Sequence, residues 1–180
     1  MKRNLQKKTQ SSNAPKLVSF VGRSNSGKTT LLTKIIPLFK KQGLLVGTIK
    51  NTHHDVEFDV PGKDSWKYRR SGSDRTLVSS GKKIAIYAES SYKTPLAELV
   101  TTWFGDMDLV ISEGFKNEEC LKIEVVRSAN NKRPLFHESE FRIDAIVSDV
   151  PVDSTLPTFR FDETESIVAW ICKALLLPCS

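Results

Sequence analysis

The chain has 180 residues, and its 27 Lys and Arg residues exceed its 21 Asp and Glu residues by six. Residues 1–16 hold five of the basic residues and no acidic one, so the rest of the chain balances at 22 basic against 21 acidic residues. This balance excludes the broad positive surface of a nucleic-acid-binding domain. No apolar run approaches the roughly 20 residues of a membrane-spanning helix, and polar residues stand where a secretory signal would have its apolar segment.

These properties predict a cytoplasmic protein with one folded domain over residues 15–180 and a disordered basic leader over residues 1–14. The cysteines Cys120, Cys172 and Cys179 lack the C-x-x-C spacing of metal sites and redox motifs. Because they are also odd in number, we expect free thiols in a reducing compartment rather than a disulfide framework.

The first predicted elements are a buried strand over 17–21 and a helix over about 28–42, which should end at Gly43. The segment between them matches the pattern G-x-x-x-x-G-K-[ST] without a mismatch, and it reads Gly22-Arg23-Ser24-Asn25-Ser26-Gly27-Lys28-Thr29. A strand, a glycine loop and a helix N-terminus in this order direct backbone N–H groups toward an anion. A Gly/Ser turn matching by chance would not need these flanking elements, so we predict a nucleoside triphosphate site.

Each part of this loop has an expected role. Lys28 should contact the β- and γ-phosphates, and the Thr29 hydroxyl should bind Mg²⁺. Glycine at position 27 lets the backbone approach a phosphate without a Cβ in the way. The predicted nucleotide-binding residues are Gly22, Ser24, Asn25, Ser26, Gly27, Lys28, Thr29, Thr30 and Asp149. Asp149 directly follows a predicted strand over 145–148.

The remaining elements alternate between strands and helices. A strand over 44–50 precedes a polar segment, a short helix over about 64–71, and a hairpin with strands over 75–79 and 84–88. A helix from Pro95 to about Trp103 precedes strands over 108–113, 121–127, 145–148 and 158–161, and a closing helix follows. This order predicts an α/β three-layer sandwich with a mostly parallel sheet of the P-loop NTPase type and a β-hairpin insertion.

The apolar run over 108–112 ends in Glu113, as does a second nucleotide-binding strand whose carboxylate holds Mg²⁺ through water. Any buried strand ending in Glu would match by itself, but the phosphate loop makes Glu113 a predicted Mg²⁺ and catalytic residue, together with Lys28. On the strand over 121–127, Lys122 and Arg127 lie on opposite faces, so at most one of them can line the site.

The polar segment over 50–65 holds two of the three histidines and follows the carboxyl end of a strand, where open parallel sheets bind ligands. The alternative is that these are ordinary loop histidines. The candidates for binding a second ligand are Lys50, His53, His54 and Lys63. The acidic residues whose alternation fits either an edge strand or a solvated face are Asp55, Glu57 and Asp59.

The ordered set of motifs resembles the molybdopterin-guanine dinucleotide biosynthesis protein B family over residues 17–127. The resemblance rests on residues 22–31, on Lys50 with His53-His54-Asp55, on residues 59–65, on Glu113-Gly114-Phe115-Lys116, and on residues 122–127. It implies a dimeric, GTP-binding, weak GTPase that assists the guanylyltransferase attaching GMP to molybdopterin. The prediction that the nucleotide is GTP rather than ATP rests on the resemblance. The residues themselves do not support it, because the segment Asn131-Lys132-Arg133-Pro134 lacks the acid of the usual guanine signature.

The resemblance also assigns roles outside the phosphate loop. Asp64 follows Pro61-Gly62-Lys63 in the family motif, which makes it a candidate Mg²⁺ ligand or water-positioning catalytic residue, whereas its alternative role is that of a helix N-cap. Molybdopterin carries a phosphate for Lys50 and Lys63 and polar ring edges for His53 and His54.

Two other functions remain open from the residues alone. One is a metallochaperone-like scaffold in which GTP sets the conformation of a dimer and His53 and His54 hold a metal ion. The other is a small-molecule P-loop kinase, which would need an arginine-rich lid, and the candidates for such a lid are Arg69, Arg70 and Arg75.

Overall fold

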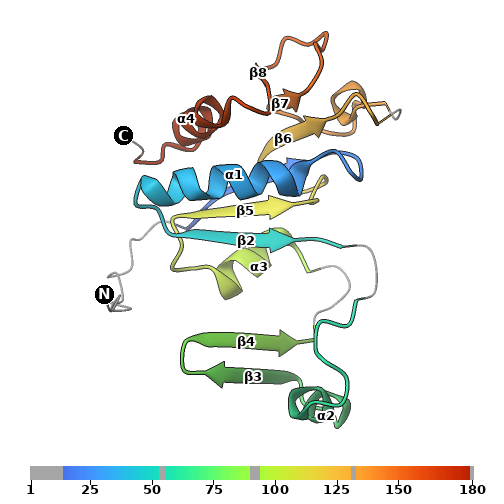
Figure 1. Ribbon diagram of the computed structural model, residues 1–180, viewed down its shortest axis with the longest axis vertical. Helices are drawn as coiled ribbons and strands as arrows, with labels where there is room; N and C mark the ends of the chain where they lie inside the picture. Colours follow the sequence, from blue (N-terminus) through green and yellow to red (C-terminus); the bar gives the residue numbers. More distant parts are fainter. Residues whose placement is uncertain (1–13, 53–55, 90–93, 131–132, 179–180) are drawn as a thin grey trace. The chain divides into compact units, whose positions relative to one another are not determined.

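The computed structural model describes residues 14–52, 56–89, 94–130 and 133–178 (Figure 1). The chain forms two compact units. We call residues 96–180 together with the chain up to Asn51 the core unit, and residues 52–95 the hairpin unit. The leader over 1–14 lies almost entirely outside the described residues, and one domain over 15–180 stays a prediction.

The core unit contains a six-stranded sheet and three α-helices, one of them short. Its elements are β1 (Lys16–Val21), α1 (Lys28–Lys41), β2 (Val46–Lys50), α3 (Leu96–Trp103), β5 (Leu109–Glu113), β6 (Leu121–Val126), the 3-10 helix η1 (Leu135–His137), β7 (Ala145–Ser148), β8 (Thr158–Phe159) and α4 (Thr164–Leu175). Each except η1, which the sequence analysis did not predict, lies within a few residues of its predicted range. Helix α1 is followed closely by Gly43 with φ 81°, as expected for a helix C-terminus.

The strands of this sheet lie in the order β2-β5-β1-β6-β7-β8, and every neighbouring pair is parallel (Figure 1). The predicted mostly parallel sheet is therefore confirmed. Because parallel strands share one direction, their carboxyl ends meet along one edge of the sheet. That edge carries the phosphate loop after β1 and Glu113 at the end of β5.

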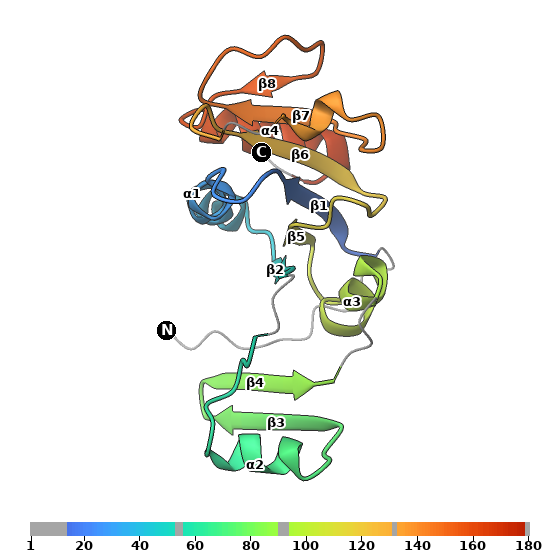
Figure 2. The same cartoon turned by 90° about the vertical axis from the view of Figure 1, so that its right-hand side faces the viewer.

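Helices cover both faces of the sheet (Figure 2). Alternate residues of β1 point to opposite faces: Val18 and Phe20 pack with α1 and α4, whereas Leu17 packs with α3. The larger apolar cluster joins the strands to α1 and α4 through side chains that include Ile35, Phe39 and Ile171. The layers therefore match the predicted three-layer sandwich.

The hairpin unit contains α2 (Asp64–Arg70), β3 (Arg75–Ser80) and β4 (Lys83–Ala88), and the two strands form an antiparallel sheet of their own. The predicted β-hairpin is confirmed. The expected edge strand over the acidic residues is wrong for the described part, because residues 56–60 form no strand. Asp59 is instead 6% exposed, and its Oδ1 accepts hydrogen bonds from Ser65 Oγ at 3.0 Å and from the Val60 amide at 2.8 Å.

Two global expectations also have an outcome here. Among the described residues, none of the helices combines the length and apolar character required to cross a bilayer. Cys120 is a free thiol, as expected, but Cys172 is disulfide-bonded, so the expectation of free thiols is wrong for that residue. An odd number of cysteines still permits one pair, and the spacing rule for metal sites does not detect it.

Candidate nucleotide-binding site

The loop between β1 and α1 has a backbone that its glycines make possible. Gly22 has φ 135° and Gly27 has φ 87°, values that residues with a side chain rarely adopt. A Cβ on Gly22 would lie 2.5 Å from the carbonyl oxygen of Val125 on β6. The close approach of β6 therefore fixes glycine at position 22 for steric reasons, independent of any ligand.

The substitution Gly22→Ala should lower the free energy of unfolding by about 2–5 kcal/mol, since it combines left-handed backbone strain with a backbone clash. Denaturant unfolding followed by circular dichroism measures the loss. Gly105→Ala is the matched control, because its Cβ would meet only the Thr101 carbonyl oxygen at 3.6 Å. Equal stability of the two variants would contradict the steric argument.

Lys28 lies inside the phosphate loop. Its Nζ donates hydrogen bonds to the carbonyl oxygens of Gly22 at 3.1 Å and of Arg23 at 2.9 Å. Burial lowers the pKa of Lys28, and the nearby Glu113 carboxylate opposes this shift. An ammonium held by neutral carbonyl groups in a half-buried loop gains from an anionic acceptor, and phosphate oxygens provide one.

Thr29 and Glu113 meet at the carboxyl edge of the sheet. The Thr29 hydroxyl lies 3.0 Å from Oε2 of Glu113, and Lys50 Nζ lies 3.8 Å from Oε1. Register explains the meeting, because Phe20, Glu113 and Lys50 align across β1, β5 and β2. A hydroxyl and one carboxylate suit Mg²⁺, which takes few protein oxygens and completes its shell with phosphate and water. These side chains therefore fit the expected Mg²⁺.

The other predicted residues of the loop lie around Lys28. Ser26 is buried, whereas Ser24, Asn25, Thr29 and Thr30 are exposed to solvent. Asn25 has φ 61°, a left-handed conformation that Asn tolerates better than most residues. The part that these residues play in nucleotide binding stays a prediction.

Four predicted site residues lie in the hairpin unit or outside the described residues. Lys63 and Asp64 belong to the hairpin unit, so their part in ligand or Mg²⁺ binding stays a prediction. The alternative N-cap role of Asp64 is wrong, because Asp64 is the first residue of α2 and Lys63 occupies the cap position. The Asp64 carboxylate lies 3.6 Å from Lys67 Nζ. His53 and His54, with Asp55, fall outside the described residues.

Two side chains that the sequence analysis did not bring together, Arg127 and Phe161, lie beside Gly27 at the end of the phosphate loop. The Arg127 guanidinium carbon lies 4.0 Å from the centre of the Phe161 ring, and both side chains border Gly27. Arg127 also lies 3.7 Å from Asp149, a predicted nucleotide-binding residue. Lys122 lies within β6 and is buried, and its amide donates to the Asp144 carboxylate, whereas Arg127 lies one residue beyond the end of β6. Their placement on opposite faces of the strand stays a prediction.

Residues on both sides of positions 131–132 contact the phosphate loop. The Arg23 guanidinium donates to the Arg133 carbonyl oxygen at 3.0 Å and pairs with Glu138. Asn130 Nδ2 donates to the Ser24 carbonyl oxygen at 2.9 Å. The buried Glu124 carboxylate anchors residues 133–138 to β6, because its Oε1 accepts the Leu135 amide at 2.7 Å and its Oε2 accepts the Phe136 amide at 2.8 Å.

Glu124→Gln should lower the free energy of unfolding by about 1–3 kcal/mol, because one buried amide loses its acceptor. Burial raises the pKa of Glu124, so its contribution is greatest below its unfolded-state pKa and is lost as pH rises through its folded-state pKa. The gap between wild type and variant should therefore narrow from acidic toward neutral pH. Denaturant titrations across this range test it, with exposed Glu140→Gln as control. A pH-independent gap would contradict the assignment.

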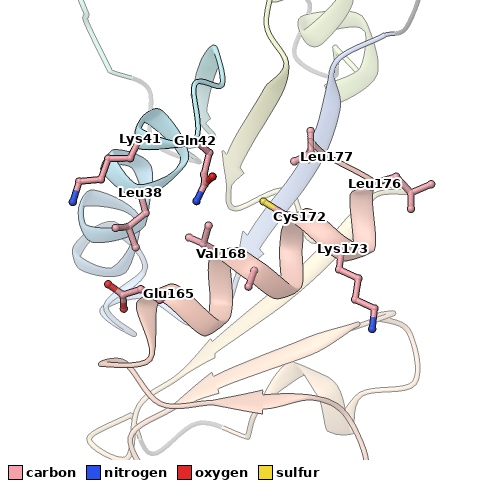
Figure 3. A pocket seen from close by; sticks show the side chains of 10 residues that line it. Leu38, Lys41, Gln42, Glu165, Val168, Cys172, Lys173, Leu176 and Leu177 are labelled. Carbon is pink, nitrogen blue, oxygen red and sulfur yellow. The ribbon is translucent and has the colours of Figure 1, made fainter. Parts of the chain in front are cut away.

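A hollow of about 410 Å³ lies between α1 and α4 (Figure 3). Its lining includes Leu38 and Gln42 at the carboxyl end of α1 and Val168 and Cys172 on α4. The phosphate loop lies at the opposite, amino end of α1. The hollow is therefore separate from the candidate nucleotide site.

The chain is similar to proteins of known family. The curated Molybdopterin-guanine dinucleotide biosynthesis adapter protein of Escherichia coli K12 is 35% identical over 168 residues, covering 87% of this chain and 94% of that protein. The adapter protein of the same name from Haemophilus influenzae is 36% identical over 143 residues, covering 78% and 79%.

Solved structures agree with this relationship. The crystal structure of molybdopterin-guanine biosynthesis protein B (mobB) matches with a TM-score of 0.73 at 34% identity, covering 88% of this chain and 99% of that one. Bacillus subtilis MobB matches with a TM-score of 0.71 at 26% identity, covering 89% and 98%. The family model described as Molybdopterin guanine dinucleotide synthesis protein B matches residues 17–149. The chain therefore belongs to the molybdopterin guanine dinucleotide synthesis protein B family.

Proposed function

We propose that this chain binds GTP with Mg²⁺, hydrolyses it slowly, and acts as an adapter when GMP is attached to molybdopterin. The observation that carries the proposal is the 3.0 Å approach of the Thr29 hydroxyl to Glu113, beside the ammonium of Lys28. Bound Mg²⁺ would neutralise charge on the phosphates. Lys28 would orient the β- and γ-phosphates, and Glu113 would hold the metal through water.

The adapter role rests on the relatives, because both curated proteins carry the name Molybdopterin-guanine dinucleotide biosynthesis adapter protein. In this chain, the adapter would bind molybdopterin and the molybdenum cofactor guanylyltransferase. We assign the anionic pterin to the segment that begins at Lys50, whose side chain is 65% exposed beside the nucleotide site. A lysine there offers a cation to the phosphate of the pterin.

We also infer a homodimer formed through the hairpin unit. Leu77 pairs with Ile86 and Ser79 pairs with Ile84, so Leu77, Ile84 and Ile86 share one face of the hairpin. These three side chains are exposed, the most being Ile84 at 67%. An isolated two-stranded hairpin is marginally stable, and exposed apolar faces of this kind are typical of interaction surfaces. A second copy would bury this face.

The kinase alternative loses support in the hairpin unit. Arg69 binds Glu57 at 2.8 Å and lies 3.6 Å from Glu89, and the Arg70 guanidinium lies 5.8 Å from the Trp66 ring. These contacts hold both side chains within their own unit, where they stabilise local structure. A lid needs arginines that close over a phosphate.

The substitution Lys50→Ala tests the adapter assignment. GTP affinity should stay within about fivefold of wild type, because an exposed ion pair such as Lys50–Glu113 contributes only ~0–1 kcal/mol. Formation of the dinucleotide cofactor with the partner transferase should fall, since the pterin loses a cation. The measurement is therefore paired: GTP affinity by titration calorimetry, and cofactor formation in a reconstituted assay.

Lys34→Ala is the control, because Lys34 is an exposed lysine on α1. It should leave both quantities unchanged. If Lys50→Ala forms the cofactor at the wild-type rate, the segment beginning at Lys50 does not deliver the pterin.

A further inference from the structure

The proposed Mg²⁺-binding residues Thr29 and Glu113 determine which way a bound nucleotide would run along the edge of the sheet. In the strand order, β5 and β6 flank β1 on opposite sides. Thr29 and Glu113 would hold the Mg²⁺ that accompanies the terminal phosphates, so these phosphates would lie on the β5 side of the loop. The nucleoside must then extend the other way, toward the carboxyl ends of β6, β7 and β8.

Three side chains stand at those ends. Arg127 directly follows β6, Asp149 directly follows β7, and Phe161 comes two residues after β8. A Cβ built on Gly27 would lie 3.2 Å from a terminal guanidinium nitrogen of Arg127 and 3.4 Å from Phe161 Cε1. The stacked pair therefore borders the last glycine of the phosphate loop, on the side toward which the nucleoside points.

Asp149 is held in place with acceptor capacity to spare. Its Oδ1 accepts the Ser128 amide at 2.8 Å, and its Oδ2 accepts the Ser128 hydroxyl at 3.1 Å. An ionised carboxylate has about four lone-pair positions, so these two bonds leave room for further donors. The side chain of Asp149 is 27% exposed and that of Arg127 is 37% exposed, so a ligand can reach both.

The state of Asp149 suits one base. Hydrogen bonds from Ser128 lower the pKa of the Asp149 carboxyl, which keeps it ionised and acceptor-only near neutral pH. The Watson–Crick edge of guanine offers two adjacent donors, N1–H and the 2-amino group, that fit a carboxylate. Adenine presents an unprotonated N1 in the corresponding place, which a carboxylate repels.

We propose that Arg127, Asp149 and Phe161 form the base-binding end of the nucleotide site, and that the Asp149 carboxylate selects guanine over adenine. The inference rests on the proposed triphosphate site. The base stacks on the guanidinium plane of Arg127, which the Phe161 ring supports from the other side. Asp149 then meets the edge of the base. Asp149, which directly follows β7, would supply the acidic group that the segment over 131–134 lacks.

Asp149→Asn is the direct test, with GTP, ATP, xanthosine triphosphate and inorganic triphosphate titrated against the full chain. The wild type should prefer GTP to ATP by at least about tenfold. The variant should lose about tenfold to a hundredfold in GTP affinity. It should gain affinity for xanthosine triphosphate, whose base carries an oxygen in place of the 2-amino group and can accept from the Asn amide. Inorganic triphosphate, which lacks a base, should bind both proteins equally.

Two further variants keep the result interpretable. Phe161→Leu should weaken GTP and ATP about equally, because it removes the ring that supports the Arg127 guanidinium, and stacking on that guanidinium does not distinguish bases. It should leave inorganic triphosphate binding unaffected. Asp162→Asn is the matched control, since this neighbouring carboxylate is 74% exposed and pairs with Arg160 at 3.3 Å. It should change no affinity.

The outcomes separate this inference from the proposed function. If the wild type binds neither nucleotides nor inorganic triphosphate, both fail. If it binds GTP and ATP equally, or if Asp149→Asn weakens GTP, ATP and xanthosine triphosphate alike, the triphosphate site stands and the base assignment is overturned. In the second case the Arg127–Asp149 pair would only join the ends of β6 and β7.

Discussion

Lys28→Ala is expected to abolish measurable GTP binding while the protein keeps its fold. The Nζ of Lys28 makes hydrogen bonds to the carbonyl oxygens of Gly22 and Arg23, which can bind water instead when the side chain is shortened. A Mg–triphosphate complex has no such substitute, because it loses a charge-assisted contact to its most highly charged phosphates. Titration calorimetry measures the affinity, and thermal unfolding reports the fold.

Lys34→Ala on the exposed side of α1 controls for the loss of one positive charge from the same helix. It should bind GTP as the wild type does. Unchanged GTP affinity in Lys28→Ala would refute the central proposal, since the motif over 22–29 holds no other lysine. Loss of binding in both variants would instead indicate a general electrostatic effect.

Local pattern was sufficient to predict the phosphate loop and its partner. The motif over 22–29 predicted the phosphate loop, and an apolar run ending in Glu113 predicted the carboxylate beside it. Both conclusions depend only on residues close together in sequence and on the rule that parallel strands present their carboxyl ends at one edge. The 3.0 Å approach of Thr29 to Glu113 is consistent with that rule.

The base-binding end could not be assembled in the same way. Arg127, Asp149 and Phe161 meet only because β6, β7 and β8 are neighbours in the sheet, and the sequence does not state that order. Phe161 was expected within a strand over 158–161, but β8 ends at Phe159, which leaves Phe161 beyond the strand. Its place beside Gly27 is a tertiary result.

Asp59 shows a second limit of sequence patterns. Alternating acidic residues fit an edge strand or a solvated face, and both interpretations leave the carboxylate in water. The structure buries Asp59 instead, where Ser65 and the Val60 amide donate to it. A buried carboxylate needs such donors, and here they come from the next residue along the chain and from the first turn of α2, which the periodicity of the acidic residues does not reveal.

Glu113→Gln is expected to slow GTP hydrolysis by about 10- to 100-fold, the usual cost of losing a group that orients a metal through water. GTP affinity should change less, because Lys28 and the backbone of the loop still hold the phosphates. The amide of Gln cannot supply the negative charge that attracts Mg²⁺, although it can still accept a hydrogen bond from Thr29. Single-turnover phosphate release measured over a range of Mg²⁺ concentrations separates the two quantities.

The exposed neighbour Glu119 provides the control variant Glu119→Gln, which should hydrolyse GTP at the wild-type rate. A Glu113→Gln protein with normal turnover would remove Glu113 from the mechanism. Raised Mg²⁺ should partly restore the rate of Glu113→Gln, because a weakened metal site fills at higher concentration. A rate that stays low at saturating Mg²⁺ would assign Glu113 to positioning the attacking water rather than to holding the metal.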